Sequence, residues 1–224
     1  MTRYVIPCGG DGARWGGYLG LPKQLAPVDG VPILHRTVAA LAPHGEVIVV
    51  ADDPRLDCTR LGARVEAPRR RPELGDIDKI ASSAHLWAPD RTTVIVFGDI
   101  WLSDHAITTI TTADVADWTV YGRLTGSKLT GKRWNENWAI ALAPPAHEQA
   151  QRGIERVTDL WRRGLIKRNR VSQWYLVMAG VPDAQVRYWP GRNLGHFVEI
   201  DDWTEDFDRP EEYQTWLRRR ARLA

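Results

Sequence analysis

Residues 5–34 constrain this chain more than any other part of its 224 residues. A short apolar strand is predicted over residues 4–7, and it runs directly into a glycine-rich turn that is followed by one arginine and one lysine. Glycine lets the backbone approach a ligand closely, so that successive N–H groups can point at phosphate oxygens. The segment therefore predicts a strand and a turn that bind phosphate groups.

The two cations after the turn support this interpretation. Arg14 and Lys23 would supply the positive charge that a triphosphate or a pyrophosphate requires. The chain contains five lysines and twenty-five arginines, so lysine is the rarer cation. A lysine close to a glycine-rich turn therefore indicates a specific role, and the segment predicts a nucleotide phosphate site.

The spacing excludes two better-known glycine-rich loops. A P-loop requires the pattern GxxxxGK[ST], but Lys23 follows Pro22 rather than a glycine. The dinucleotide pattern GxGxxG requires a glycine at its third place, and GGDGARWG fits it only when the frame is shifted. We therefore expect a nucleotide site of another class.

The segment resembles the signature G-x-G-x-R…P-K of nucleotidyltransferases. That family includes the sugar-1-phosphate nucleotidyltransferases and the cytidylyltransferases of isoprenoid and choline-phosphate metabolism. The matching residues are Gly10, Gly12, Arg14, Pro22 and Lys23, and the match extends through Gln24, Leu25, Gly30, Pro32, Ile33 and Leu34. The resemblance implies catalytic roles for Arg14 and Lys23. It also implies nucleotide binding by Gly9, Gly10, Asp11, Gly12 and Ser82.

The first 112 residues alternate between strands and helices. Residues 33–42 carry apolar side chains at helical spacing, whereas residues 46–51 and 92–97 are continuous apolar runs, as expected of strands that are buried on both faces. A short strand is predicted at residues 63–67 and a helix at residues 76–88. This alternation predicts an α/β fold with a mainly parallel sheet between two layers of helices.

The pattern is less regular beyond residue 112. We expect strands at 118–123, 138–142, 185–189 and 196–200, and helices at 146–163, at 170–179 and from about 210. No linker separates two domains, so we expect one domain with a nucleotide-binding half (1–112) and an acceptor-binding half (113–224). The resemblance implies the GT-A-like fold of nucleotide-diphospho-sugar transferases, a three-layer α/β/α sandwich with a mainly parallel mixed sheet.

A reaction at the phosphate groups of a nucleotide needs a divalent metal ion to offset their negative charge. Asp99 is the best single candidate for a ligand of this ion. Asp99 follows an apolar strand, and ligands in open α/β sheets bind at the carboxyl ends of strands. The resembling family places a metal-binding aspartate at the corresponding Gly-Asp position. We expect Mg²⁺, with Mn²⁺ as the alternative ion. Asp104 follows Ser103 at a predicted helix start, where a carboxylate is favoured for structural reasons.

The second metal ligand has two candidate positions. Asp201 and Asp202 end the last predicted strand, and a further acidic run, which includes Asp206 and Asp208, follows them. The family often ends with a strand-end aspartate and a D-x-P-E-D-[LY] helix start, so the match admits either position. Asp208 precedes Arg-Pro-Glu, which fits a helix N-cap. We therefore predict that Asp201 or Asp202 is the metal partner of Asp99.

Two further segments carry open alternatives. Ser82 and Ser83 lie in a predicted helix where the family contacts the base or ribose, but they could equally be ordinary helix serines. The loop at residues 123–137 would either hold a sugar phosphate or be a solvated loop. Its candidate residues are Lys128, Lys132, Arg133, Trp134 and Glu136.

Composition excludes several classes of protein. The net charge of +2 is too small to imply nucleic-acid binding by itself. No run approaches 18 apolar residues and no charged leader opens the chain, so we expect no membrane partner. Cys8 and Cys58 have neither disulfide-framework nor metal-type spacing, which favours a reduced cytoplasm.

The resemblance implies transfer of a nucleotidyl group from a nucleoside triphosphate to a sugar-1-phosphate or a similar phosphorylated small molecule, with release of pyrophosphate. The main alternative is a glycosyltransferase on the same fold that uses a nucleotide sugar. Nucleic acid, such as modified DNA, is an expected partner only in that alternative, through basic segments such as residues 69–71 and 218–220. A non-catalytic nucleotide-binding protein would be indicated only if Asp99 or Lys23 were misplaced.

Overall fold

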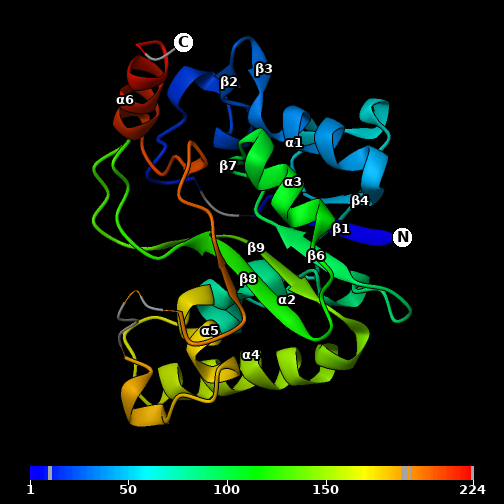
Figure 1. Cartoon of the computed structure of the whole chain (residues 1–224), viewed down its shortest axis with the longest axis vertical. Coiled ribbons are helices and arrows are strands. Elements are labelled where there is room, and N and C mark those ends of the chain that lie inside the picture. The colour runs from blue at the N-terminus through cyan, green and yellow to red at the C-terminus, as the bar shows by residue number, and fades with distance from the viewer. Residues whose placement is uncertain (10–11, 188–190, 192, 223–224) are drawn as a thin grey trace.

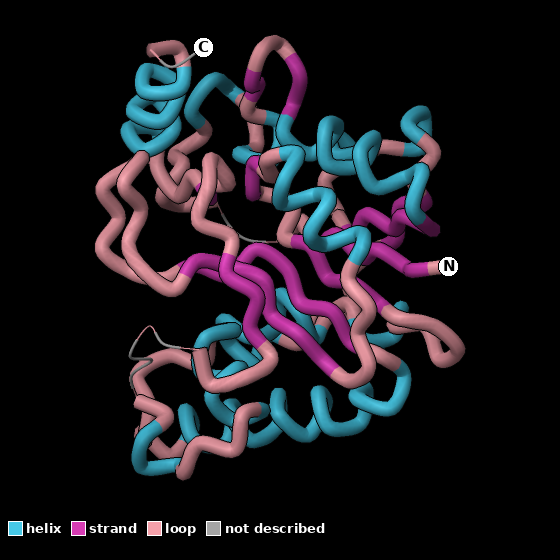
Figure 2. The backbone as a smooth tube through the Cα atoms, in the orientation of Figure 1, coloured by secondary structure: helices cyan, strands magenta, loops and turns pink. Residues whose placement is uncertain are grey.

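A seven-stranded mixed sheet runs through the centre of the molecule (Figures 1 and 2). The computed structural model describes residues 1–9, 12–187, 191 and 193–222. The strand order is β10-β8-β9-β6-β1-β4-β5; β9 is antiparallel to both of its neighbours, and the other four pairs are parallel. The strands are β1 (Thr2–Pro7), β4 (Gly45–Val50), β5 (Arg64–Glu66), β6 (Thr93–Val96), β8 (Trp118–Arg123), β9 (Glu136–Leu142) and β10 (Phe197–Glu199).

Helices cover both faces of this sheet. Figure 1 shows α1 and α3 on one side, and α2, α4 and α5 on the other. The helices are α1 (Ile33–Leu41), α2 (Asp78–Ala81), α3 (Asp104–Thr112), α4 (His147–Arg162), α5 (Val171–Met178) and α6 (Pro210–Arg220). The expected three-layer α/β arrangement with a mainly parallel mixed sheet is therefore confirmed.

Two small strand pairs and several 3₁₀ helices complete the description. One pair is β2 (Pro27–Val28) with β3 (Val31–Pro32), and the other is β7 (Ile100–Trp101) with β11 (Glu205–Asp206). The 3₁₀ helices are Tyr18–Gly20, Lys23–Leu25, Ala42–His44, Pro54–Leu56, Thr59–Leu61, Pro72–Ile77, Ala84–Leu86, Pro144–Ala146 and Asp183–Gln185. Within the described ranges, no helix is long and apolar enough to cross a bilayer.

The single long helix predicted at residues 76–88 is wrong. The chain instead forms a 3₁₀ turn, the four-residue helix α2 and a second 3₁₀ turn. The Ser83 hydroxyl donates to the carbonyl of Ile80 at 2.9 Å, and the Ser82 carbonyl accepts from the backbone N–H of Arg69. The Ser83 hydroxyl and the Arg69 N–H therefore occupy carbonyl groups that a continuing helix would use, and the helix ends after one turn.

The strand predicted at residues 185–189 is also wrong where it can be checked. Pro182 is followed by the 3₁₀ helix Asp183–Gln185, and residues 186–187 form a turn. Residues 188–189 lie outside the described residues. The other predicted strands and helices are present, with ends that shift by one or two residues.

Gly98 allows the ends of β1 and β6 to lie close together. A Cβ atom at Gly98 would lie 2.5 Å from the sulfur of Cys8, which follows β1. The N–H of Gly98 donates to the carbonyl of Pro7 at 3.3 Å. Because these two strands are neighbours in the sheet, the close approach places the residue after Gly98 beside the turn that follows β1.

Candidate active site

Lys23 is held at a fixed place beside the end of β1. It opens the 3₁₀ helix Lys23–Leu25 directly after Pro22. The next side chain, Gln24, is buried and donates to the carbonyl of Cys8 at 3.1 Å. This bond joins the Pro-Lys-Gln segment to the strand that leads into the glycine-rich turn.

The turn after β1 is anchored by a buried tryptophan. The carbonyl of Gly12, whose φ is +59°, accepts from the N–H groups of Trp15 and Gly16 at 2.9 and 3.1 Å. The Trp15 indole is 2% exposed and donates to the carbonyls of Tyr18 and Leu21. A rigid anchor follows the turn, as a preorganised phosphate site requires.

Gly9 lies against a cation that the sequence analysis did not connect with the turn. A Cβ atom at Gly9 would lie 3.1 Å from Nη1 of Arg70, so the guanidinium group packs on this glycine. Arg70 is itself paired with Asp52 at 2.8 Å. Gly10 and Asp11, which are also predicted to bind the nucleotide, lie outside the described residues.

The Lys23 ammonium is surrounded by three carboxylates. Its Nζ lies 2.5 Å from Oδ2 of Asp99, 3.4 Å from Oδ1 of Asp206 and 3.6 Å from Oδ1 of Asp208. All four side chains are 16% exposed or less. We call these four residues the Lys23 cluster. It joins the segment after β1 to the turn after β6 and to the end of the chain.

The pairing of β7 with β11 brings the late acidic residues to Asp99. Asp206 lies opposite Ile100, the residue directly after Asp99, in this antiparallel pair. Successive side chains of a strand point to opposite faces, so Asp206 faces Lys23 while Glu205 faces the interior. A contact between residues over one hundred positions apart therefore assembles the site.

Charge in the Lys23 cluster is tightly coupled. Burial alone would lower the pKa of Lys23, but Asp206, Asp99 and Asp208 outweigh it and hold the pKa well above its ordinary value. Burial alone would raise the pKa of Asp99, but Lys23 and Lys79 together hold it far below its ordinary range. The lysine is therefore cationic and Asp99 anionic at neutral pH.

Two further cations face the cluster. Arg14 Nη1 contacts Oδ2 of Asp208 at 2.6 Å, while more than half of the Arg14 side chain stays exposed. Lys79, in α2, acts on Asp99 and lies with its Nζ 4.6 Å from the centre of the Phe97 ring. No motif in the sequence points to Lys79, and the scarcity of lysine is the one signal that could have identified it.

A second lysine, Lys132, lies behind the cluster among more carboxylates. Its side chain is 1% exposed, and its Nζ donates to the backbone carbonyl of Asp206 at 2.6 Å. Its Nζ also lies within 3.5 Å of carboxylate oxygens of Glu136 and Glu212. Burial opposes the charge of Lys132, but Asp206 and Glu136 raise its pKa above the ordinary value. Lys132 is thus a buried counter-charge and has no exposed ammonium for a sugar phosphate.

Glu205 is fully buried beneath the site. Arg123 contacts both oxygens of Glu205, at 3.3 and 3.4 Å, and the Ser127 hydroxyl donates to the same carboxylate. Removing one partner of such a pair leaves an uncompensated buried charge, at a cost of about 3–5 kcal/mol. The pair therefore fixes β11, and with it Asp206, against the end of β8.

The structure places Asp201 and Asp202 away from these contacts. Asp202 accepts from the Ser103 hydroxyl and, at 2.7 Å, from the backbone N–H of Thr204. Asp201 is partly exposed, and its nearest described cation is Lys128 at 3.9 Å. Among the described side chains, neither aspartate is an ion-pair partner of Lys23.

The predicted helix-capping role of Asp208 is wrong. The N-cap of α6 is Arg209, and the Glu212 carboxylate accepts from the N–H groups of Asp208 and Arg209 at 2.9 and 3.2 Å. The carboxylate of Asp208 is instead directed at Arg14 and Lys23. Sequence spacing alone does not distinguish these two uses, because both need an aspartate just before the helix.

Ser82 is buried at the end of α2. The residue is 4% exposed and directly follows α2, the helix that carries Lys79. By contrast, Ser103 caps α3 as expected, with its hydroxyl accepting from the N–H of Ala106, and Asp104 pairs with Arg36 at 2.6 Å. Asp104 therefore has the structural role that its position indicates.

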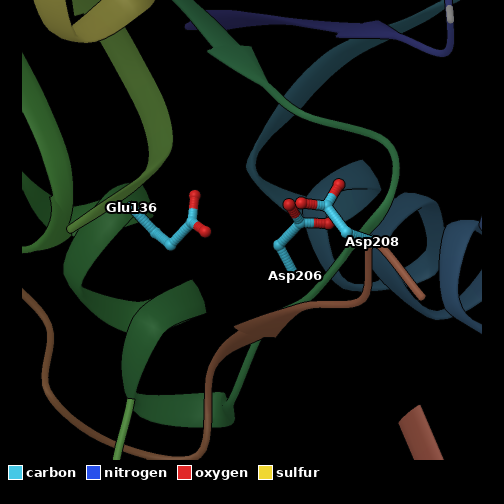
Figure 3. Close-up of side chains that lie close together, drawn as sticks. All are labelled: Glu136, Asp206 and Asp208. Atoms are coloured by element: carbon cyan, nitrogen blue, oxygen red, sulfur yellow. The ribbon is translucent and has the colours of Figure 1, made fainter. Parts of the chain in front are cut away.

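Three carboxylates of the site fit a divalent ion. Glu136, Asp206 and Asp208 each offer an oxygen, and these oxygens lie within 4.8 Å of one another (Figure 3). Figure 3 shows the carboxyl groups of Asp206 and Asp208 close together, with Glu136 facing them. Carboxylate oxygens are the hard ligands that Mg²⁺ and Mn²⁺ prefer, so the donor set matches the expected ion.

Residues 4–126 match the MobA-like NTP transferase domain. No curated protein matches the chain.

Three solved structures illustrate the structural likeness. CTP:phosphocholine cytidylyltransferase from Streptococcus pneumoniae has a TM-score of 0.58 at 12% identity, over 97% of this chain and 98% of the other. The inositol-1-phosphate CTP transferase from T. maritima has a TM-score of 0.55 at 13% identity, over 96% and 94%. CMP:2-keto-3-deoxy-manno-octonic acid synthetase has a TM-score of 0.56 at 15% identity, over the full length of both chains. At these identities the likeness establishes a shared fold.

Glu136 gives the site a measurable pH dependence. Burial raises the pKa of Glu136 to about 7, with a contribution from Asp206 and Asp208 and against the charge of Lys132. The folded state therefore keeps a proton that the unfolded state has released, and stability is lost as the pH rises through 7. With EDTA present, we expect the free energy of unfolding to fall by about 1–3 kcal/mol between about pH 5 and pH 8.

Urea unfolding at several pH values tests this. Glu136→Gln should flatten the decline and be more stable than the unchanged protein at about pH 8. Glu148→Gln, on the exposed face of α4, is the matched control and should leave the decline in place. Parallel curves for the protein and Glu136→Gln would contradict the assignment.

Proposed function

The chain belongs to the family of MobA-like NTP transferase domains, and from this premise we propose that it transfers a nucleotidyl group from a nucleoside triphosphate to a sugar-1-phosphate or a similar phosphorylated small molecule. The resemblance of its sequence to nucleotidyltransferases is thereby confirmed. The observation that carries the proposal is the contact between Lys23 and Asp99, directly beside the turn that follows β1. It joins a cation for phosphate groups to a strand-end carboxylate, as this reaction requires.

The reaction needs positioning and charge rather than a general base. An oxygen of the acceptor phosphate attacks the α-phosphorus and forms a new P–O bond, while the bond from the α-phosphorus to the pyrophosphate oxygen breaks. The acceptor phosphate is already ionised near neutral pH. Turn amides near Gly12 would hold the triphosphate, and Arg14 and Lys23 would stabilise the charge that grows on the leaving oxygens.

A divalent ion, Mg²⁺ or Mn²⁺, is part of the proposal. When bound, it would offset negative charge on the α-phosphate and the pyrophosphate. We assign Asp99, Asp206 and Asp208 as the residues that hold it, with Glu136 beside them. This assignment is supported by the position of all three aspartates around Lys23, whereas Asp201 and Asp202 have other partners. The earlier choice of Asp201 or Asp202 remains the competing prediction.

The single ammonium group of Lys23 therefore has two roles. In this structure it neutralises the carboxylates, and in the reaction it would contact the triphosphate. Arg14 is similarly shared, because its exposed part can reach phosphate while Nη1 stays near Asp208. A cytoplasmic location is also part of the proposal, supported by the two free, buried cysteines Cys8 and Cys58.

A pyrophosphate-release screen tests the proposed reaction. Each of the common nucleoside triphosphates is incubated with Mg²⁺ and a panel of phosphorylated acceptors, with the unphosphorylated sugars and alcohols as matched controls. We expect pyrophosphate release with at least one triphosphate, only when the acceptor carries a phosphate. Turnover of a nucleotide sugar without pyrophosphate release under any condition would favour the glycosyltransferase instead.

Substitution of the carboxylates tests the metal assignment. Asp99→Asn, Asp206→Asn and Asp208→Asn should each lower Mg²⁺-dependent kcat roughly a hundredfold or more, the scale expected for losing one preorganised electrostatic contact. Asp201→Asn removes a more exposed carboxylate and should stay within about twofold of the unchanged protein. Loss of activity in Asp201→Asn or Asp202→Asn at unchanged melting temperature, with Asp206→Asn active, would restore the competing prediction.

A further inference from the structure

A basic cavity lies between the end of α4 and the beginning of α5. Its volume is about 530 Å³, within the range of small-molecule sites. Figure 1 shows α4 and α5 below the sheet, away from α6 and β7 above it. The lining residues are Gly164, Leu165, Lys167, Arg168, Arg170, Ser172, Gln173 and Arg187. None of them belongs to the Lys23 cluster.

Among the described residues, carboxylates balance only part of the positive charge of this cavity. Four of its lining residues are cations and none is acidic. Arg170 is paired with Asp76 at 3.3 Å. In the part of the chain that the structure describes, no ion pair joins Lys167, Arg168 or Arg187 to a carboxylate. All three residues are exposed to solvent, and an anion in the cavity would reduce the repulsion that remains between them.

The donors of the cavity suit a phosphate group. A guanidinium group presents parallel N–H donors that match two phosphate oxygens, and Arg168 and Arg187 line the same volume. Ser172 and Gln173 add a hydroxyl and an amide. Leu165 and the backbone at Gly164 add an uncharged wall, so a ligand with both a phosphate and a less polar body fits better than a bare ion.

Asn169, between the lining residues Arg168 and Arg170, connects this part of the chain to the segment that carries Lys79. Asn169 is 1% exposed; its side chain donates to the carbonyl of Leu74 and accepts from the N–H of Asp76 at 3.0 Å. A Cβ atom at Gly75 would lie 2.8 Å from the Asn169 oxygen, so only glycine fits there. A second cavity of about 330 Å³ shares Lys167 and Arg168 and reaches Gly75 and Asp76.

We propose that this basic cavity binds a phosphorylated small molecule, with a phosphomonoester held by Lys167, Arg168 and Arg187. A ligand bound between these cations would act on the position of Asn169 and, through the hydrogen bonds of Asn169 to residues 74–78, on Lys79. The charge of Lys79 acts on Asp99. Two kinds of ligand share this chemistry. One is the phosphorylated acceptor of the reaction, and the other is an effector that does not react. Binding itself does not depend on the proposed function.

Isothermal titration calorimetry tests the site, with inorganic phosphate and glucose 1-phosphate as probes and glucose as the uncharged control. The cavity variant is Arg168→Gln with Arg187→Gln. The matched control is Arg218→Gln with Arg219→Gln, which removes the same charge from the exposed end of α6. A third variant, Lys23→Ala, removes phosphate binding at the proposed reaction site.

We expect glucose 1-phosphate to bind with a Kd below about 10 mM, and to bind roughly tenfold more weakly to the cavity variant. The control variant and Lys23→Ala should keep this affinity within about twofold. Equal affinity in the cavity variant, an equal loss in the control variant, or loss in Lys23→Ala alone would each overturn the proposal. Cavity-dependent binding of a single-stranded oligonucleotide, without binding of glucose 1-phosphate, would overturn the ligand class.

Kinetics then separate the two sources. If the bound phosphomonoester is converted in the presence of a nucleoside triphosphate, and the cavity variant raises only its KM, the cavity belongs to the acceptor. If it is not converted but changes the KM for the triphosphate, and the cavity variant removes that change, it is an effector. Because calorimetry is done without turnover, failure of the proposed reaction leaves the binding result interpretable.

Discussion

The ion cluster around Lys23 is the interaction on which the rest of the site depends. One ammonium group holds Asp99, Asp206 and Asp208 together, although these carboxylates would otherwise repel one another. At the low exposure of this cluster, such charges interact more strongly than they would in water. Any ligand that takes Lys23 toward a triphosphate must therefore be accompanied by another positive charge, which is the physical argument for a divalent ion at the same carboxylates.

Two separate features of the fold bring the residues of this cluster together. Gly98 lets the turn after β6 approach Cys8, which places Asp99 beside the end of β1. The pairing of β7 with β11, and a second apolar cluster built on α6, hold the other two carboxylates in place. In that cluster Trp15 and Tyr213 pack edge to face, so the helix that follows Asp208 also supports the turn before Lys23. Most of the described tryptophans are buried and stabilise the packing in this way. Trp134 is the most exposed of the described tryptophans.

Much of the fold follows from local pattern, whereas the site depends on long-range pairing. Apolar runs and helical periodicity predict β4, β6, α1 and α4 closely, because the two strands are almost entirely buried and each of the two helices buries one face. Glycine spacing and the scarcity of lysine indicate Lys23 as a candidate site residue, and its position after a strand indicates Asp99. The sequence does not show which of Asp202 and Asp206 lies near Asp99, because this depends on which acidic residue pairs with Ile100 in β7. Asp202 instead binds Ser103 and Thr204, two partners that no motif indicates.

The most direct test of this account is the affinity of the protein for Mn²⁺, measured by electron paramagnetic resonance, in the unchanged protein and in Lys23→Met. If the Lys23 ammonium is the counter-charge of the carboxylates that hold the ion, its removal should tighten Mn²⁺ binding by roughly tenfold. Lys128→Met removes a largely exposed lysine near Asp201 and should leave the affinity unchanged. Unchanged or weaker Mn²⁺ binding in Lys23→Met, or tighter binding in Lys128→Met, would contradict the account.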